Sequence, residues 1–301
     1  MSYEKQINYT QEPIRILIRI RPFFFEEDTT ITPLIIDEKD DQTIKIGKNG
    51  QYYEGIYDKI FFSTSTQKEI FDYTSLFLNK ISNGINLTVI SYGQTGTGKT
   101  YTIFGKEWTN NANYSENFRF TKYDFIKNNM KIIQNAESNG IVPRMLLYIF
   151  NSDIIIDFDI TCSFMQIYNE KIYDLLEEDY NKFNDKFNIP YIHDITSINP
   201  INQKSLQILE DKKLGIFIQG LSQNVVNSFE DCIKILIKGE ENRKKRQTNK
   251  NELSSRSHVI FIVNLQSKNQ DEKGYIKVKY KILTKFFLDC PSNILWFSRF
   301  R

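Results

Sequence analysis

The sequence predicts an α/β fold in which short strands alternate with helices on either side of a glycine-rich loop. The loop is the run Gly93 to Thr100, which fits the phosphate-binding pattern G-x-x-x-x-G-K-[ST]. Before it, Leu87 to Tyr92 is an apolar, β-branched run typical of a buried strand. After it, no helix breaker follows Lys99 until Gly105, so one or two helical turns fit there. Strand, loop and helix in this order are the context that the pattern requires.

The residues before the loop strand predict a strand and a helix. Ile14 to Pro22 places arginines between apolar residues, and this strand ends at Pro22 because proline cannot donate a hydrogen bond to a sheet. Thr66 and Glu69 have the spacing of a capping box, and the apolar positions that follow have helical spacing. Asn83-Gly84 is typical of a helix end.

Two polar, asparagine-rich stretches, about 106–139 and 177–204, predict surface insertions. Gly140 to Arg144 begins a helix between them, with Pro143 at the first helical position. Ile160 to Tyr168 predicts a strand. One helix and one strand are therefore expected between the insertions.

A hairpin and a long helix are expected after the second insertion. Leu206 to Gly220 predicts the hairpin, and Ser228 with Asp231 marks the helix start. The apolar residues of this helix recur on one side: Phe229, Cys232, Ile233, Leu236 and Ile237. Arg243 to Arg246 carries four cations near its C-terminus. A solvated end favoured by the helix dipole is the first interpretation, and a patch that binds a partner is the second.

Composition excludes several classes of protein. The 301 residues, enough for one large domain or two small ones, hold 39 Lys and Arg against 37 Asp and Glu, which gives no general attraction to nucleic acid or anionic membranes. Cys162, Cys232 and Cys290 have neither disulfide nor metal spacing, which favours a reducing cytoplasm. We find no signal region, no run of 18 apolar residues and no coiled coil. A cytoplasmic protein without a membrane segment is expected.

Each residue type in the glycine-rich loop suits nucleotide binding. Gly93, Gly96 and Gly98 allow tight turns that direct backbone N–H groups inward. Lys99 can reach the β- and γ-phosphates, and the Thr100 hydroxyl can bind Mg²⁺. A glycine- and threonine-rich surface loop is the alternative. The flanking strand and helix favour the nucleotide interpretation.

A second polar motif precedes the predicted strand Val259 to Leu265. Asn251 to His258 contains three serines, an arginine and a histidine. Serine hydroxyls beside a phosphate can hold Mg²⁺ or a water molecule, and such loops become ordered around a γ-phosphate. An ordinary connecting loop is the alternative.

Taken together, the motifs resemble those of the kinesin motor domain. Tyr92 to Thr100 has the kinesin form of the phosphate loop, Asn251 to His258 resembles switch I, and Arg19 to Pro22 resembles the R-x-R-P segment that borders adenine. Further segments match in the same order: Tyr57 to Phe61 with Thr66-Gln67, Gly140 to Arg144, Gln166 to Leu176, and Gly239 to Arg243. The resemblance covers roughly residues 12 to 265.

This resemblance implies a three-layer P-loop motor fold with a central mixed, mainly parallel sheet flanked by helices and incomplete on one face. It implies ATP and Mg²⁺ as cofactors, microtubules as partner, and a place on the microtubule cytoskeleton. The implied catalytic residues are Lys99, Ser254, Ser255, Arg256 and Asp289, with Thr100 and Ser255 on the metal. The implied nucleotide-binding residues are Arg19, Arg21, Pro22, Gly93, Gln94, Thr95, Gly96, Thr97, Gly98, Lys99, Thr100 and Tyr101.

The sequence departs from the family at switch II, whose pattern is D-x-x-G-x-E. Asp289 matches the aspartate, but Ser292 stands at the glycine position and Ile294 at the glutamate position. Arg256 therefore lacks the glutamate that the family pairs with it. We expect a motor domain over residues 1–289, a divergent tail over 290–301, and ATP hydrolysis that is impaired or absent.

The sequence also contains none of the segments that the family places after switch II, which include the relay helix and the main microtubule-binding loops. Without them, apolar side chains such as Val89 and Phe287 are expected to risk exposure, which would make the chain poorly soluble without a partner.

Three functions stay open from the sequence. The first is a microtubule motor ATPase, with this chain truncated or incorrectly terminated. The second is a catalytically silent kinesin-like protein that binds nucleotide or acts as a scaffold. The third is an unrelated P-loop kinase or GTPase, disfavoured because Asn128 to Lys131 is not the N-K-x-D motif that reads guanine. Direction of movement, cargo and oligomeric state are not encoded in these motifs.

Overall fold

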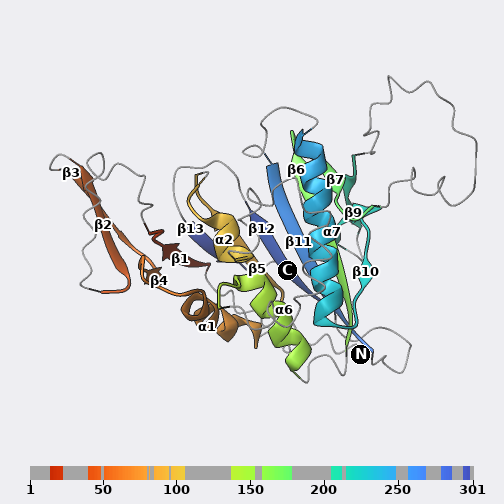
Figure 1. The fold of residues 1–301 in the computed structure, drawn as a ribbon, viewed down its shortest axis with the longest axis horizontal. Helices are drawn as coiled ribbons and strands as arrows, with labels where there is room; N and C mark the ends of the chain where they lie inside the picture. Colours follow the sequence, from red (N-terminus) through yellow and green to blue (C-terminus); the bar gives the residue numbers. More distant parts are fainter. Residues whose placement is uncertain are drawn as a thin grey trace, which may run out of the picture.

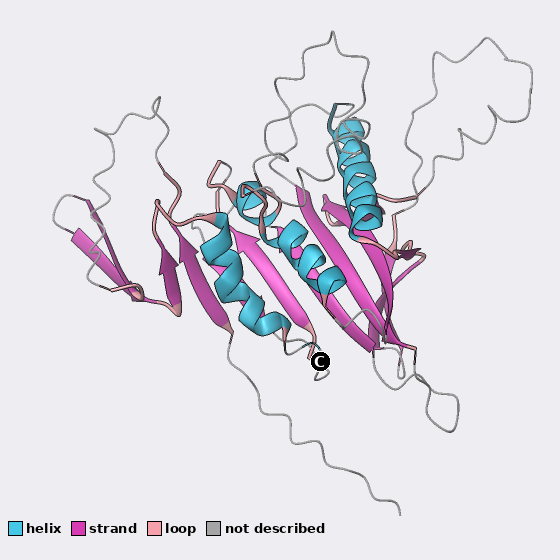
Figure 2. Cartoon of the chain, turned by 60° about the horizontal axis from the view of Figure 1, so that its bottom comes forward, coloured by secondary structure: helices cyan, strands magenta, loops and turns pink. Residues whose placement is uncertain are grey.

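A central sheet with helices packed on one face forms the body of the molecule (Figures 1 and 2). The computed structural model describes residues 14–22, 40–48, 51–79, 81, 85–94, 96–105, 137–152, 158–177, 205–211, 215–248, 257–268, 279–286 and 294–298. Within them, no helix is long and apolar enough to cross a membrane.

The central sheet has nine strands in the order β10-β6-β11-β12-β5-β13-β1-β4, with β7 paired to β6. Their bounds are β1 (Arg15–Arg19), β4 (Lys59–Phe61), β5 (Leu87–Tyr92), β6 (Phe158–Tyr168), β7 (Lys171–Asp174), β10 (Asn224–Val225), β11 (Ser257–Ser267), β12 (Lys279–Phe286) and β13 (Ile294–Ser298). Two separate hairpins are β2 (Thr43–Lys48) with β3 (Gln51–Ile56), and β8 (Gln207–Asp211) with β9 (Gly215–Gln219). The second hairpin confirms the prediction for residues 206–220.

The strand directions confirm a mixed sheet but not a mainly parallel one. β12 with β5 and β1 with β4 are parallel, whereas the other neighbouring pairs are antiparallel. A short connection joins two strands only in antiparallel orientation. At the β6–β7 turn, Asn169 and Glu170 both take positive φ, 50° and 61°, as a type I′ hairpin requires. The strand β13 also departs from the expected mainly parallel sheet, because it lies antiparallel between β5 and β1.

Four helices lie on one face of the sheet in the part of the chain that the structure describes: α1 (Gln67–Leu78), α2 (Lys99–Ile103), α6 (Ile141–Asn151) and α7 (Phe229–Thr248) (Figure 2). The capping box at α1 is confirmed, since Thr66 Oγ1 accepts from the Glu69 N–H at 3.2 Å and the Glu69 carboxylate accepts from the Thr66 N–H at 2.6 Å. α1 ends at Leu78, before the expected Asn83-Gly84.

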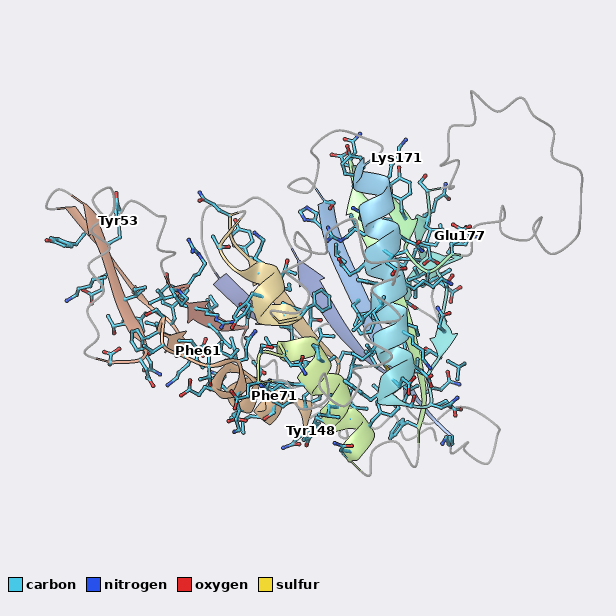
Figure 3. All side chains as sticks on the ribbon, viewed as in Figure 1. Tyr53, Phe61, Phe71, Tyr148, Lys171 and Glu177 are labelled. Carbon is cyan, nitrogen blue, oxygen red and sulfur yellow. The ribbon has the colours of Figure 1, made fainter. Side chains whose placement is uncertain are left out.

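The helix α6 begins at Ile141, so Pro143 is its third residue rather than its first. The missing N–H is still harmless there, because the first four N–H groups of a helix have no partner within it. Tyr148 of α6 donates a hydrogen bond to the Asn79 side chain just after α1, which ties the two helices together (Figure 3).

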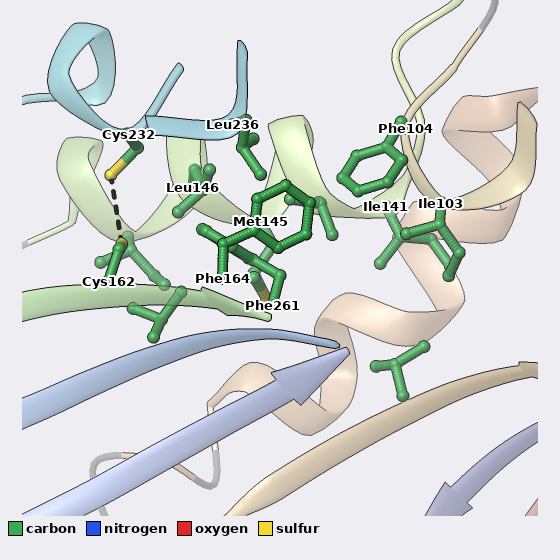
Figure 4. Close-up of a cluster of buried hydrophobic side chains, with 14 of the residues drawn as sticks. Ile103, Phe104, Ile141, Met145, Leu146, Cys162, Phe164, Cys232, Leu236 and Phe261 are labelled. Carbon is green, nitrogen blue, oxygen red and sulfur yellow. Dashed lines mark hydrogen bonds between the residues drawn. The ribbon is translucent and has the colours of Figure 1, made fainter. Parts of the chain in front are cut away.

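One large apolar cluster fills the space between these helices and the sheet (Figure 4). All five one-sided residues predicted for α7 are buried in it. Cys232 faces Cys162 of β6, with 3.9 Å between the sulfur atoms. The contact with Cys162 and the desolvation raise the pKa of the Cys232 thiol, so it stays protonated at neutral pH.

Val89 corrects the expectation of exposed apolar residues in the loop strand. It is 1% exposed, because it points with Leu87 toward the helices. Side chains alternate along a strand, so Ile90 and Tyr92 lie on the other face, where both are partly buried. Phe287 lies outside the described residues.

The face without helices is covered near both ends of the sheet. Ile218 of β9 packs on a cluster of Met165, Ile172, Ile260 and Ile262. Ile44 of β2 packs at the other end on a cluster with Ile18 and Ile60. Hairpins therefore cover two areas of the face opposite the helices.

Arg243 does not belong to a solvated helix end. Its guanidinium pairs with the Glu240 carboxylate at 2.8 Å, and the two side chains are 17% and 8% exposed. The neighbouring Asn242 donates to the Leu175 carbonyl at 2.7 Å. The solvated interpretation is therefore wrong for Arg243, and it is Asn242 that attaches α7 to the loop after β7.

Gly239 sets how closely α7 approaches the sheet. A Cβ at this position would lie 2.0 Å from Cδ1 of Phe164, which is fully buried in β6. We expect Gly239→Ala to destabilise the fold by about 1–3 kcal/mol, because this clash outweighs the helix propensity gained. Urea unfolding would measure the change. Combining it with Phe164→Leu should cost less than the sum of the single changes, and strict additivity would contradict the proposed clash.

Candidate functional site

The glycine-rich loop leaves β5 and turns sharply into α2. Gly96 and Gly98 have φ values of 85° and 92°, in the left-handed region that residues with a Cβ rarely adopt. The Thr97 N–H and hydroxyl both donate to the Gln94 carbonyl, at 3.3 and 2.7 Å. A Cβ built at Gly96 would meet no atom within 4 Å, so the space beside the loop is open. The structure therefore shows the tight, open-sided turn that the pattern predicts; Thr95 lies outside the described residues.

Lys99 is held inside this turn and is only 5% exposed. Its ammonium group donates to the Gly93 carbonyl at 2.6 Å and also to the Gln94 carbonyl. A positive charge thus lies against the loop backbone, where charge-assisted hydrogen bonds to an anion are strong. Thr100, the next residue, is half-buried in the first turn of α2.

Arg19 is partly buried at the end of β1 and contacts the helix that follows the loop. Its Nη1 donates to Gln67 Oε1 and to Thr102 Oγ1, both at 2.8 Å. Its guanidinium lies 5.0 Å from the centre of the Tyr101 ring, within reach of a cation–π contact. Burial lowers the pKa of Arg19 to about 10, so the group is still a cation at neutral pH. Arg19 therefore binds the protein itself in this structure.

Arg21 lies beside the end of the loop and also contacts Pro22. The Arg21 Nη1 donates to the Pro22 carbonyl at 3.1 Å. The Cδ of Arg21 lies 4.0 Å from a Cβ built at Gly98. The structure thus brings residues 19–22 beside the loop, although 70 or more residues separate them in sequence.

The strands next to the two predicted switch segments in the sequence meet at the end of the sheet where β5 leads into the loop. β11 begins at Ser257, and its Val259 pairs with Phe286, the last residue of β12. Phe286 in turn pairs with Ser91 near the end of β5. Ser257 and Phe286 therefore lie at the same end of the sheet as Tyr92, which leads into the loop, with β12 between β11 and β5. Ser254, Ser255, Arg256 and Asp289 themselves lie outside the described residues.

Two polar residues of this region were not among the site residues predicted from the sequence. Gln67 is 4% exposed and bonds to Arg19 and to the start of α2. Its sequence signal was its place after Thr66 in a segment that matches the family. Ser257 is fully buried, and its hydroxyl has no hydrogen-bond partner among the residues that the structure describes. No pattern in the sequence distinguishes Ser257 from the serines before it.

The structure brings together Arg19, Arg21, Tyr101 and the loop, which is most of the predicted nucleotide set. No cluster of three or more His, Cys, Asp or Glu able to hold a metal occurs in the described ranges.

Comparisons of the sequence and the fold with known proteins agree with this arrangement of the site. The family model described as kinesin motor domain matches residues 19–285. The chain is 30% identical over 300 residues to the kinesin-like protein KIN-5A of Arabidopsis thaliana, covering 97% of this chain and 25% of that protein. It is 32% identical over 263 residues to kinesin-related protein 5 of Dictyostelium discoideum, covering 86% of this chain and 22% of that protein.

A solved structure of similar fold belongs to a fast kinesin, described for its ATPase mechanism and its interactions with microtubules. The TM-score is 0.67 at 25% identity, over 90% of this chain and 64% of that one. The chain spans about a quarter of the length of the two curated relatives.

Proposed function

Because this chain belongs to the kinesin motor domain family, we propose that it binds ATP and Mg²⁺ at residues 93–100 as part of a microtubule motor. The observation that carries the proposal is Lys99, a buried cation that lies against the carbonyls of a tight loop beside open space. Microtubules are the proposed partner, and the microtubule cytoskeleton in the cytoplasm is the proposed location.

The described residues fit the parts of a nucleotide. Lys99 and the loop N–H groups would hold the β- and γ-phosphates, and Thr100 with Ser255 would bind the metal. Arg19, Arg21 and Pro22 would border the base with Tyr101; Arg21 lies beside Gly98, and Arg19 lies over the Tyr101 ring. Bound Mg²⁺ would neutralise charge on the β- and γ-phosphate oxygens.

Hydrolysis would be an in-line attack of water on the γ-phosphorus, which releases ADP and phosphate. The chain's contribution to it is positioning and charge stabilisation. Lys99 would stabilise negative charge on the phosphates. Ser254 and Ser255 would orient the nucleotide at its γ-phosphate. Asp289 would act from the segment that follows β12.

A second candidate is a kinesin-like protein that binds nucleotide but hydrolyses it slowly. The observation that favours it is the position of Ile294, which stands where the family has the switch II glutamate. Ile294 is the first residue of β13 and pairs with Tyr92 of β5 and Ile18 of β1. An apolar residue in that strand supplies no carboxylate for Arg256.

Binding of MgADP and microtubule-stimulated phosphate release separate the two candidates. Both predict saturable MgADP binding, measured by calorimetry. A motor predicts phosphate release that rises steeply with added microtubules, whereas the second candidate predicts release that stays near the unstimulated rate. The replacement of two switch II residues by Ser292 and Ile294 is the feature that favours the second candidate in this test. Absence of MgADP binding would exclude both candidates.

A further inference from the structure

We propose that Gln67 is a positioning residue of the nucleotide site, acting through Arg19 and Tyr101 on the nucleoside side of the ligand. The inference rests on the proposed nucleotide binding. Gln67 is the first residue of α1, and its side chain is buried. It lies where β1, α1 and α2 meet, beside the loop that would hold the phosphates.

The amide of Gln67 uses both of its ends. Its Oε1 accepts from Arg19 Nη1 at 2.8 Å, and its Nε2 donates to the Tyr101 carbonyl at 2.6 Å and the Ser138 carbonyl at 3.3 Å. An amide both donates and accepts, whereas an ionised carboxylate only accepts. Glutamine is therefore well suited to bind the cation of Arg19 and a backbone carbonyl of α2 at once.

Arg19 transmits this position to the Tyr101 ring. Gln67 and Thr102 both accept a hydrogen bond from Arg19 Nη1. These two bonds orient the guanidinium 5.0 Å from the centre of the Tyr101 ring. The same Gln67 amide holds the Tyr101 backbone. Arg19 thus restrains the face of the Tyr101 ring, and Gln67 restrains the main chain of Tyr101.

This network is separate from the contacts that hold the phosphate-binding lysine. Lys99 donates to the Gly93 and Gln94 carbonyls, which Gln67 does not contact in the described structure. A phosphate chain held in the loop must extend toward its nucleoside, and Arg21 lies beside Gly98 at the boundary of the loop. A change at Gln67 should therefore weaken recognition of the nucleoside and not of the phosphates.

The test compares ADP with inorganic pyrophosphate, both with Mg²⁺, by calorimetry on the whole chain. Gln67→Ala should weaken ADP binding about ten-fold and change pyrophosphate binding less than about two-fold, as expected for lost charge-assisted positioning. Gln67→Glu keeps an acceptor for Arg19 but loses the donor to Tyr101, so a loss of about three-fold for ADP is expected. Gln67→Glu also tests the inference if Gln67→Ala does not fold.

The matched control is Thr74→Ala in the same helix. Thr74 is also buried, and its hydroxyl donates to the Phe71 carbonyl at 3.0 Å, away from the loop. This change should leave both affinities as they are. Equal losses for ADP and pyrophosphate at Gln67 would make it a general support of the loop and overturn the inference, as would unchanged ADP binding. If the unaltered chain binds neither ligand, the proposed function fails together with the inference.

Discussion

Replacing Lys99 by alanine is expected to weaken MgADP binding at least about a hundred-fold, or roughly 2.7 kcal/mol. The reason is the burial of this cation. Lys99 is 5% exposed, and its ammonium group lies against the loop carbonyls, so a phosphate entering the loop would meet a charge that water hardly screens. Calorimetry would measure the affinity. The rise in melting temperature on adding MgADP would report it independently.

The control for this change is Lys68→Ala. Lys68 is 71% exposed and pairs with Asp72 one turn along α1. Such surface pairs contribute little to stability, so this variant should bind MgADP as the unaltered chain does. Retention of tight binding by Lys99→Ala would contradict the assignment of the loop as the phosphate site. Melting temperatures without ligand must be compared, so that unfolding is not taken for lost binding.

Placing proline at Trp296 is expected to destabilise the fold by about 3 kcal/mol or more, and to lower its melting temperature by roughly 5–10 °C. Trp296 lies in the middle of β13, paired with Ile90 of β5 on one side and Ile16 of β1 on the other. Every interior N–H of a strand paired on both sides bonds to a neighbour, so proline removes a hydrogen bond there.

The consequence extends beyond one bond, because β13 alone joins β5 to β1 among the described strands. Loss of β13 would separate the strand that leads into the loop from the strand that carries Arg19. Trp296→Phe, which keeps the backbone N–H, is the control and should melt much closer to the unaltered chain. Equal melting of the proline and phenylalanine variants would show that β13 does not hold the sheet together in solution.

Local features of the fold were predictable because short-range physics specifies them. Thr66 and Glu69 form the capping box within a few residues of each other, and the left-handed glycines are confirmed at Gly96 and Gly98. The one-sided spacing of α7 predicted its buried face, since a helix repeats every 3.6 residues whatever it packs against. The order of motifs was enough to predict the family.

Contacts between distant residues were not predictable in this way. The family resemblance predicts that Arg19 borders the base, but its contacts with Gln67, Thr102 and Tyr101 are visible only in the structure. Nothing in the residues around Gln67 indicates that its amide connects three elements. The bond from Asn242 to the Leu175 carbonyl likewise joins residues 67 apart in the sequence.

The sequence by itself determined the phosphate loop, the capping box at the start of α1 and the buried face of α7. Each of these depends on residues that are close together along the chain, where spacing and side-chain chemistry act directly. The tertiary structure decided the direction of the strands, the burial of Val89 and the place of residues 294–298 between β5 and β1. Strand pairing joins segments about 200 residues apart, and which edges meet depends on how the whole sheet assembles.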